Sequence, residues 1–267
     1  NNIENDLSLQ VISAISEKDT TKLNMLSENN KEQIEKLTET AIKNADASEE
    51  SANLIAKVVA NASDELVNKV VEEVNKNSNE EKQALSAKVM KSIVETNPDK
   101  IETLSDQNRE TMISQTIEAA KNQAEETSAD EIDLSNTIAE IITKSDTGTA
   151  AEVLEILEDV SNESESKLSL SVVSNITKQE NYEEKMEILS VTSPIVEQSI
   201  NKLIEKAVEN ASSEEDLDSV TNIIENSKGT ISDKVINSAN KNDESKKKIT
   251  EIIVNIIEKN PEKAIEI

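Results

Sequence analysis

Two clusters of carboxylates come nearest, in residue type and spacing, to a site that could do chemistry. They contain Asp130, Glu131 and Asp133 in one case, and Glu214, Glu215, Asp216 and Asp218 in the other. Carboxylate oxygens are preferred ligands of Ca²⁺, but neither cluster has the EF-hand spacing with its central Gly and terminal Glu. Each cluster stands where a helix is expected to begin, so we interpret both as caps that offset the helix dipole. We therefore predict no metal site.

The residues that common catalytic sites require are missing from this chain. There is no His and no Cys, which excludes the usual zinc sites, iron–sulfur clusters, thiol catalysis and a Ser-His-Asp triad. Gly148 and Gly229 are the only glycines, too few for a dinucleotide or phosphate loop. A carboxylate pair for glycoside hydrolysis needs a cleft, usually aromatic-lined, and Tyr182 is the only aromatic residue. We predict that the protein is not an enzyme and has no catalytic or cofactor-binding residues.

The charge of the chain argues against two further classes of partner. The formal net charge is −27, from 55 acidic and 28 basic residues, whereas nucleic-acid binding needs clustered Lys and Arg. Lys246, Lys247 and Lys248 form the densest basic run, which we interpret as a solvated turn beside Asp243 and Glu244. No apolar run approaches the roughly 18 residues that span a bilayer. We expect neither nucleic acid as a partner nor a transmembrane segment.

Anchors for protein recognition are also scarce. Binding surfaces are enriched in Trp, Tyr, Arg and Met, but this chain has one Tyr, one Arg and four Met. Tyr182 lies in an expected break between helices, inside a small insertion. A hot spot for a partner is one interpretation. We favour the other, in which its ring packs on a neighbouring helix.

The most informative feature is an internal repeat. The segment "KSIVETNPDKIET", which begins at Lys91, returns as "VNIIEKNPEKAIE", which begins at Val254. Units start near Leu7, Leu85, Leu168 and Ile249, at successive spacings of 78, 83 and 81 residues. This period is longer than that of the common single helical-hairpin repeats. We predict repeat units over 1–84, 85–167 and 168–248, with 249–267 as the truncated start of a fourth.

Within a unit, the apolar residues recur at helical spacing. In the second unit this predicts helices at about 80–95, 98–106, 109–124, 130–144 and 149–160. Asn97 and Pro98 fit an N-cap followed by Pro at the first helical position. Ser63, followed by Asp64 and Glu65, predicts another helix start.

These elements predict an all-α fold without a β-sheet, in which the units stack as an α-solenoid. The short second helix would restore the chain direction from one unit to the next. Each unit then resembles an armadillo-type three-helix module beside a HEAT-type two-helix module, at the level of architecture only. A coiled coil is disfavoured because no heptad is sustained. A compact helical bundle remains the structural alternative.

Equivalent apolar positions of the units should be buried if the alignment is correct. One set contains Val59, Ile142 and Ile224, and the other contains Ile15, Ile93, Ile176 and Ile256. The last helix carries Ile249, Ile252, Ile253, Ile256 and Ile257 with no covering helix after it in the sequence. We expect either an internal portion of a longer array or ends that meet in neighbouring molecules, head to tail.

Three functional hypotheses follow from these features. The first is a non-catalytic structural repeat segment of a longer extracellular or cell-surface protein, acting as a stalk or a filament through contacts with adjacent repeats or other copies. The second is an intracellular, cytoplasmic solenoid scaffold that binds protein partners along its concave face. The third, an enzyme, has no motif in its favour.

Overall fold

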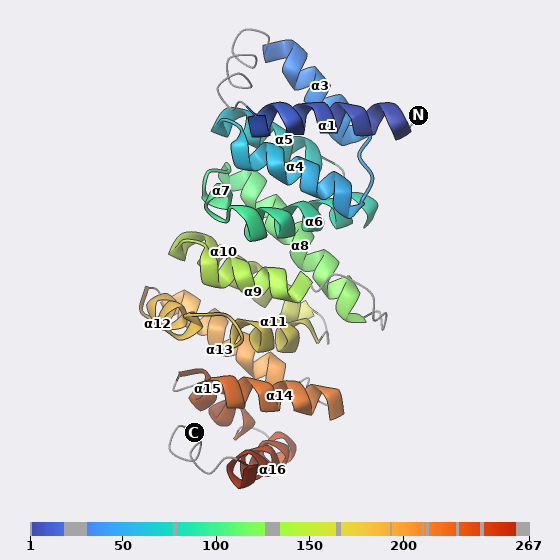
Figure 1. The fold of residues 1–267 in the computed structure, drawn as a ribbon. Helices are drawn as coiled ribbons and strands as arrows, with labels where there is room; N and C mark the ends of the chain where they lie inside the picture. Colours follow the sequence, from blue (N-terminus) through green and yellow to red (C-terminus); the bar gives the residue numbers. More distant parts are fainter. Residues whose placement is uncertain are drawn as a thin grey trace. The chain divides into compact units, whose positions relative to one another are not determined.

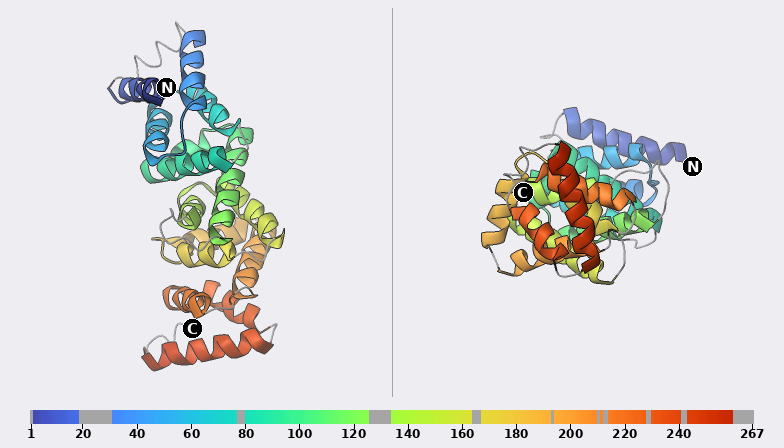
Figure 2. Two further views of the ribbon diagram at one scale, coloured as in Figure 1. Left: turned by 90° about the vertical axis from the view of Figure 1, so that its right-hand side faces the viewer. Right: turned by 90° about the horizontal axis from the view of Figure 1, so that it is seen from below.

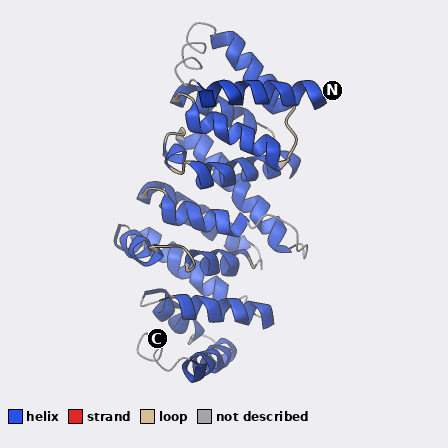
Figure 3. Ribbon diagram, in the orientation of Figure 1, coloured by secondary structure: helices blue, strands red, loops and turns tan. Residues whose placement is uncertain are grey.

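A computed structural model describes residues 2–18, 31–76, 80–125, 134–163, 167–192, 194–209, 211, 214–227, 230–240 and 243–259. All regular elements in these ranges are helices, and no strand occurs in them (Figure 3). The all-α prediction is therefore confirmed.

The helices follow one another in the order labelled in Figure 1. They are α1 (Asn2–Lys18), α3 (Lys31–Lys43), α4 (Glu49–Asn61), α5 (Asp64–Asn75), α6 (Glu80–Thr96), α7 (Asp99–Glu102), α8 (Asp106–Glu125), α9 (Leu134–Lys144), α10 (Thr147–Glu163), α11 (Leu168–Ile176), α12 (Tyr182–Thr192), α13 (Pro194–Glu209), α14 (Glu214–Asn226), α15 (Thr230–Ala239) and α16 (Asp243–Lys259). The five helices predicted for 80–160 correspond to α6 through α10, with ends that differ by a few residues.

The chain divides into two compact units, an N-terminal unit (Asn1–Ala119) and a C-terminal unit (Ala120–Ile267). In the N-terminal unit, α4 packs between α1 and α6 (Figure 1). A second row is formed by α3 and α5, and the first part of α8 is hydrogen-bonded to α5. Contacts of α1 with α3, and of α5 with α4 and α6, join the two rows.

In the C-terminal unit, α11 packs between α9 and α14, and α14 also contacts α16. The second row here consists of α10, α13 and α15, with α12 packed on α10 and α13 (Figure 2). The division between the compact units falls inside α8. The repeat boundaries at 84/85, 167/168 and 248/249 describe sequence similarity instead, and they stay a prediction.

Local sequence explains where several helices begin. Ser48 is the N-cap of α4, and its hydroxyl accepts a hydrogen bond from the backbone N–H of Ser51 at 3.1 Å. Ser63 is the N-cap of α5, as predicted, although no side-chain capping bond forms there. Pro98 occupies the N-cap of α7, one residue later than the Asn97 that the sequence predicted. The helix expected over 98–106 is thus a single turn.

The core consists of aliphatic side chains, as expected for a chain with one aromatic residue. Val59, Ile142 and Ile224 are all buried, and so are Ile93, Ile176 and Ile256. Ile15 departs from its set, because it is only half-buried. The equivalent residue Ile93 lies on α6, which packs against both α4 and α5, whereas the described partners of α1 are α3 and α4. A shared apolar position is therefore buried only where a neighbouring helix covers it.

Within the described ranges, no helix combines the length and the hydropathy that crossing a bilayer requires.

Candidate functional site: a polar groove between α5 and α8

Asparagine side chains of α5 organise a polar groove along α8 in the N-terminal unit. The carbonyl oxygen of the Asn68 side chain accepts hydrogen bonds from the backbone N–H of Ser105 at 2.6 Å and from the side-chain amide of Asn108 at 3.1 Å. The side-chain amide of Asn68 donates to the backbone carbonyl of Thr103 at 3.2 Å. Asn68 thus satisfies backbone groups at the turn where α8 begins, which otherwise lack intrahelical partners.

Seven residues further along α5, Asn75 repeats this role two turns away. Its amide donates to the backbone carbonyl of Asn108 at 3.0 Å, and its own backbone carbonyl accepts from the Gln115 side chain at 3.4 Å. The spacing of seven residues places Asn68 and Asn75 on one face of α5. The sequence contains this spacing, but side chain–backbone bonds to residues 33 to 40 positions away have no local signature.

Charged groups line the open side of this groove. The cavity has a volume of about 370 Å³ and is lined by Glu72, Asn75, Lys76, Ser105, Gln107, Asn108 and Thr111. A hydrogen bond from Lys69, at 3.0 Å, is the main cause that holds the pKa of Glu72 below its usual value. The pKa of Lys76 is raised, chiefly by its hydrogen bond to Glu73. Both charges are therefore retained at neutral pH, and hydroxyls and amides supply the rest of the lining.

In the C-terminal unit, a different set of polar groups joins α10 and α13, the helices that correspond to α5 and α8. On α10, Glu158 accepts a hydrogen bond from the Ser199 hydroxyl of α13 at 2.6 Å and forms an ion pair with Lys202. Glu158 aligns with Asn75 at an offset of 83 residues, which is also the offset that carries Leu85 onto Leu168. The same position therefore reaches the next helix in both units, with an amide in one and a carboxylate in the other.

One lysine contact is found at equivalent places in both units. Lys100 on α7 donates to the backbone carbonyl of Ala62, just after α4 ends, at 3.4 Å. Lys185 on α12 donates to the backbone carbonyl of Ser145, just after α9 ends. Helix C-termini carry unpaired carbonyls and partial negative charge, which explains why an ammonium group binds there. We call these two contacts the lysine latches.

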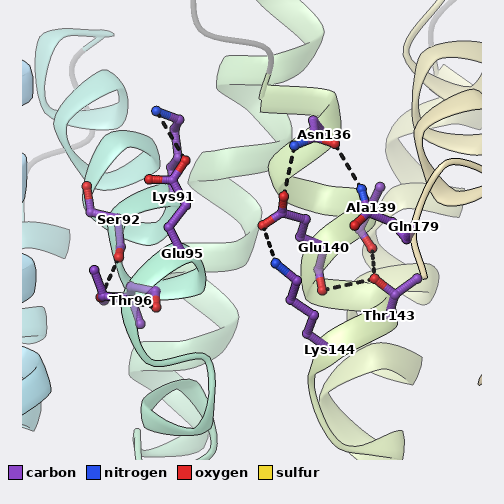
Figure 4. A network of polar contacts seen from close by, with 11 residues as sticks. Lys91, Ser92, Glu95, Thr96, Asn136, Ala139, Glu140, Thr143, Lys144 and Gln179 are labelled. Atoms are coloured by element: carbon purple, nitrogen blue, oxygen red, sulfur yellow. Dashed lines mark hydrogen bonds and ion pairs between the residues drawn. The ribbon is translucent and has the colours of Figure 1, made fainter. Parts of the chain in front are cut away.

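Further polar networks lie on single helices and on their immediate neighbours (Figure 4). In the N-terminal unit, the Thr96 hydroxyl donates to the backbone carbonyl of Ser92 at 2.6 Å on α6. In the C-terminal unit, Glu140 on α9 accepts from the amide of Asn136 at 3.0 Å and pairs with Lys144 at 2.9 Å (Figure 4). Gln179, which follows α11, donates to Asn136 at 3.0 Å. Only the bond from Gln179 joins two segments, and the other contacts lie within one helix; together these groups form no arrangement of nucleophile, base and oxyanion donors.

The structure describes one of the two acidic clusters in part and the other not at all. Residues 130–133 and the side chains of Glu214 and Glu215 lie outside what the structure describes. Asp216 is buried, 3% exposed, and pairs with Lys167 at the start of α11 at 2.9 Å. The sequence predicted a cap at Asp216, whereas the structure adds an interhelical ion pair. Among the described carboxylates, no group of three is placed to hold a metal ion.

The structure also shows where Tyr182 and the lysine run 246–248 lie. Tyr182 is buried, and its hydroxyl donates to the backbone carbonyl of Asn226 at 3.1 Å. Its packing role is confirmed, but it begins α12 rather than lying in a loop, and it follows Asn181, which has a φ of 58°. Lys246, Lys247 and Lys248 lie within α16, so the predicted turn is wrong. Lys246 and Lys247 are nonetheless exposed to solvent, as expected.

Comparison with protein-family models, curated proteins and solved structures finds no match for this chain.

Proposed function

We propose that this chain is a non-catalytic structural segment, in which helical repeats of about 80 residues stack as an α-solenoid and serve as a surface stalk or a filament. The observation that carries the proposal is the pair of lysine latches. Lys100 and Lys185 occupy the same place in the second and third repeats once the small insertion that contains Tyr182 is allowed for, and each binds the carbonyl just after a helix that precedes it, α4 or α9. A contact that recurs with the sequence period is expected when each repeat docks on the one before it.

The order of helices supports the same proposal. The second repeat contains α6 through α10 and the third contains α11 through α15, so each has five described helices, although the second one is a single turn in α7 and 11 residues long in α12. The first helix of the second repeat and that of the third each contact the equivalent helix before them, as α6 with α4 and α11 with α9. Burial of the shared apolar positions Val59, Ile142 and Ile224 fits a continuous aliphatic core.

Small-angle X-ray scattering distinguishes the proposed stack from the compact bundle. A compact globule of this length has a radius of gyration of about 18 Å. We expect a clearly larger value, together with a scattering profile typical of an elongated particle, at protein concentrations where the chain is monomeric. A value near that of the compact globule would contradict the solenoid.

The polar groove between α5 and α8 favours a second candidate function, a cytoplasmic scaffold that binds protein partners. Its amides, hydroxyls and charged pair offer hydrogen bonds to an extended peptide. Hydrogen exchange in the presence of a purified partner tests this role. Protection of the α5 and α8 amides that line the groove is expected, and protection confined to other helices would contradict it.

A further inference from the structure

One face of α1 is exposed to solvent, although the same face of its counterparts α6 and α11 is covered. Val11 is 43% exposed, and Gln10 and Ala14 beside it are exposed as well. At the offsets of the repeat, these three positions correspond to 88, 89 and 92 on α6 and to 171, 172 and 175 on α11. Val89 and Val172 are both 0% exposed. The three equivalent helices thus share a valine that is buried in two of them and uncovered in α1.

The opposite face of α1 is packed as it is in the counterparts. Leu9 and Ile12 are 3% exposed, and the equivalent residues of α6 and α11 are also buried, namely Ala87, Met90, Leu170 and Val173. This face meets α4, because the Ser16 hydroxyl donates to the backbone carbonyl of Lys57 at 3.5 Å and Glu17 pairs with the Lys57 side chain at 2.9 Å. Helical spacing places Val11 on the side away from Ser16. The difference between α1 and its counterparts is therefore confined to the face that points away from α4.

The counterparts show what covers this face. On α6, Lys88 donates to the backbone carbonyl of Ala47, just before α4, at 2.6 Å. The Ser92 hydroxyl donates to the side-chain oxygen of Asn53 on α4 at 2.8 Å. On α11, the residue equivalent to Ser92 is Asn175, which binds Ser135 on α9. In both cases the face is therefore covered by the equivalent helix of the preceding repeat, α4 or α9.

The neighbouring helix α3 shows the same difference. Leu37 is 38% exposed. It aligns with Gln115 on α8 at the offset of 78 residues, and with Leu203 on α13 where "KLTETAI" from 36 matches "KLIEKAV" from 202. Gln115 and Leu203 are 7% and 3% exposed. Gln115 donates to the backbone carbonyl of Asn75 on α5, and α13 packs on α10, so the last helix of the preceding repeat lies on this side of both.

We propose that the faces of α1 and α3 that carry Val11 and Leu37 dock the two-helix hairpin that ends a further unit of the same repeat. The occupant is a hairpin of the α4–α5 kind, with aliphatic side chains for Val11 and Leu37. This inference rests on the proposed stacking of repeats and names the partner of one surface. A second copy of this chain is less suited, because its α4 already packs against α1 and α6, and its α14 against α11 and α16.

An introduced thiol tests this docking, because the sequence contains no Cys. Repeating residues 168–242 directly before Asn1 places a copy of α14 and α15 ahead of α1, as the originals stand ahead of α16. Val11→Cys is made in the whole chain with and without this extension. Reaction of the thiol with a maleimide should be at least about tenfold slower in the extended chain, since the copied hairpin must open before the reagent enters. Circular dichroism verifies that both chains are helical.

Three controls separate docking from a general effect of the added segment. Val254→Cys on α16 is matched to Val11→Cys, since Val254 is 47% exposed and lies outside the repeated residues, and its reactivity should not change. An extension of the same composition in shuffled order should leave the thiol at position 11 as reactive as before. Leu37→Lys in the extended chain should speed the reaction at position 11 by at least about threefold, because docking would then bury a charge.

Other outcomes overturn the proposed docking. A thiol at position 11 that reacts equally fast in both chains would exclude it, whether or not the added segment folds. So would a slower reaction that the shuffled extension reproduces. Protection that appears without the extension and grows with protein concentration would make another copy of the chain the occupant instead. The scattering experiment uses the chain without the extension, so it judges the solenoid independently of these results.

Discussion

The side-chain amide of Asn175 donates to the hydroxyl of Ser135 at 2.8 Å, and both residues are buried. This bond joins α11 to α9 across 40 residues of sequence. We expect Asn175→Ala to lower the free energy of unfolding by about 1–3 kcal/mol, because it removes a buried polar partner. Ser135→Ala combined with Asn175→Ala should cost less than the sum of the single changes. Urea denaturation of the four proteins measures this coupling, and strictly additive losses would show that the bond contributes nothing.

Truncation of a core isoleucine should be costly. Ile142 is 0% exposed, so Ile142→Ala should destabilise the chain by about 2–5 kcal/mol through the lost burial and the cavity left behind. Val191→Ala, at 80% exposure, should change stability by less than about 0.5 kcal/mol in dilute solution. Equal losses for the two variants in thermal or urea unfolding would be inconsistent with this assignment of the core.

The lysine latches should contribute measurably to stability. Lys100→Met and Lys185→Met keep the apolar stem but remove the ammonium group from the helix end, at an expected cost of about 1 kcal/mol each. Lys91→Met is the control, since Lys91 lies within α6 and forms a surface ion pair with the exposed Glu95, at 3.5 Å, instead of binding the end of another helix. Its effect should stay below about 0.5 kcal/mol. Latch variants as stable as the control would remove the main support for repeat-to-repeat docking.

Asn68 should be the most sensitive residue of the polar groove. Asn68→Ala removes hydrogen bonds to Thr103, Ser105 and Asn108, and we expect a loss of about 1–3 kcal/mol. Asn61→Ala, which removes a bond to the backbone carbonyl of Lys57 within α4, should cost less. Faster hydrogen exchange at the start of α8 should accompany the first change and not the second.

The turn before α4 should introduce a dependence of stability on pH. Hydrogen bonds from Ser48 and then Ser51 hold the pKa of Asp46 below its usual value. A lowered folded-state pKa stabilises the fold above the unfolded pKa of about 4, and the benefit is lost as pH falls through the folded value. Because Asp46 is largely exposed, we expect no more than about 0.5 kcal/mol.

Asp46→Asn should therefore lower stability at pH 6, and its difference from the wild type should shrink toward pH 3. Glu155→Gln, at an exposed position in the middle of α10, serves as the control. A difference between Asp46→Asn and the wild type that grows as the pH falls would have the wrong sign.

The polar groove illustrates what the sequence could not predict. No pattern in the sequence groups Asn68, Asn75 and Asn108. An asparagine has the same local sequence signature whether its amide faces water or a distant backbone carbonyl. Lys100 lies in the Asn-Pro segment that returns near the end of the chain, where Lys263 stands at the matching position. The partner of Lys100, the carbonyl of Ala62, carries no side-chain signal at all. The role of Lys100 therefore follows from the geometry alone.

The sequence by itself determined the helices and most of the core, because helical periodicity and burial of Val59, Ile142 and Ile224 depend on spacing within a few turns. Only the tertiary structure decided how these faces are used. Ile15 and Ile93 share a position in the repeat, yet one is half-buried and the other buried, because burial depends on which helices lie alongside. Likewise, the sequence predicts only a helix cap at Asp216. The structure shows that Asp216 also pairs with Lys167, which is distant in sequence, at 2.9 Å. Local spacing specifies each helix, whereas the neighbours of a side chain come from parts of the chain that local spacing does not encode.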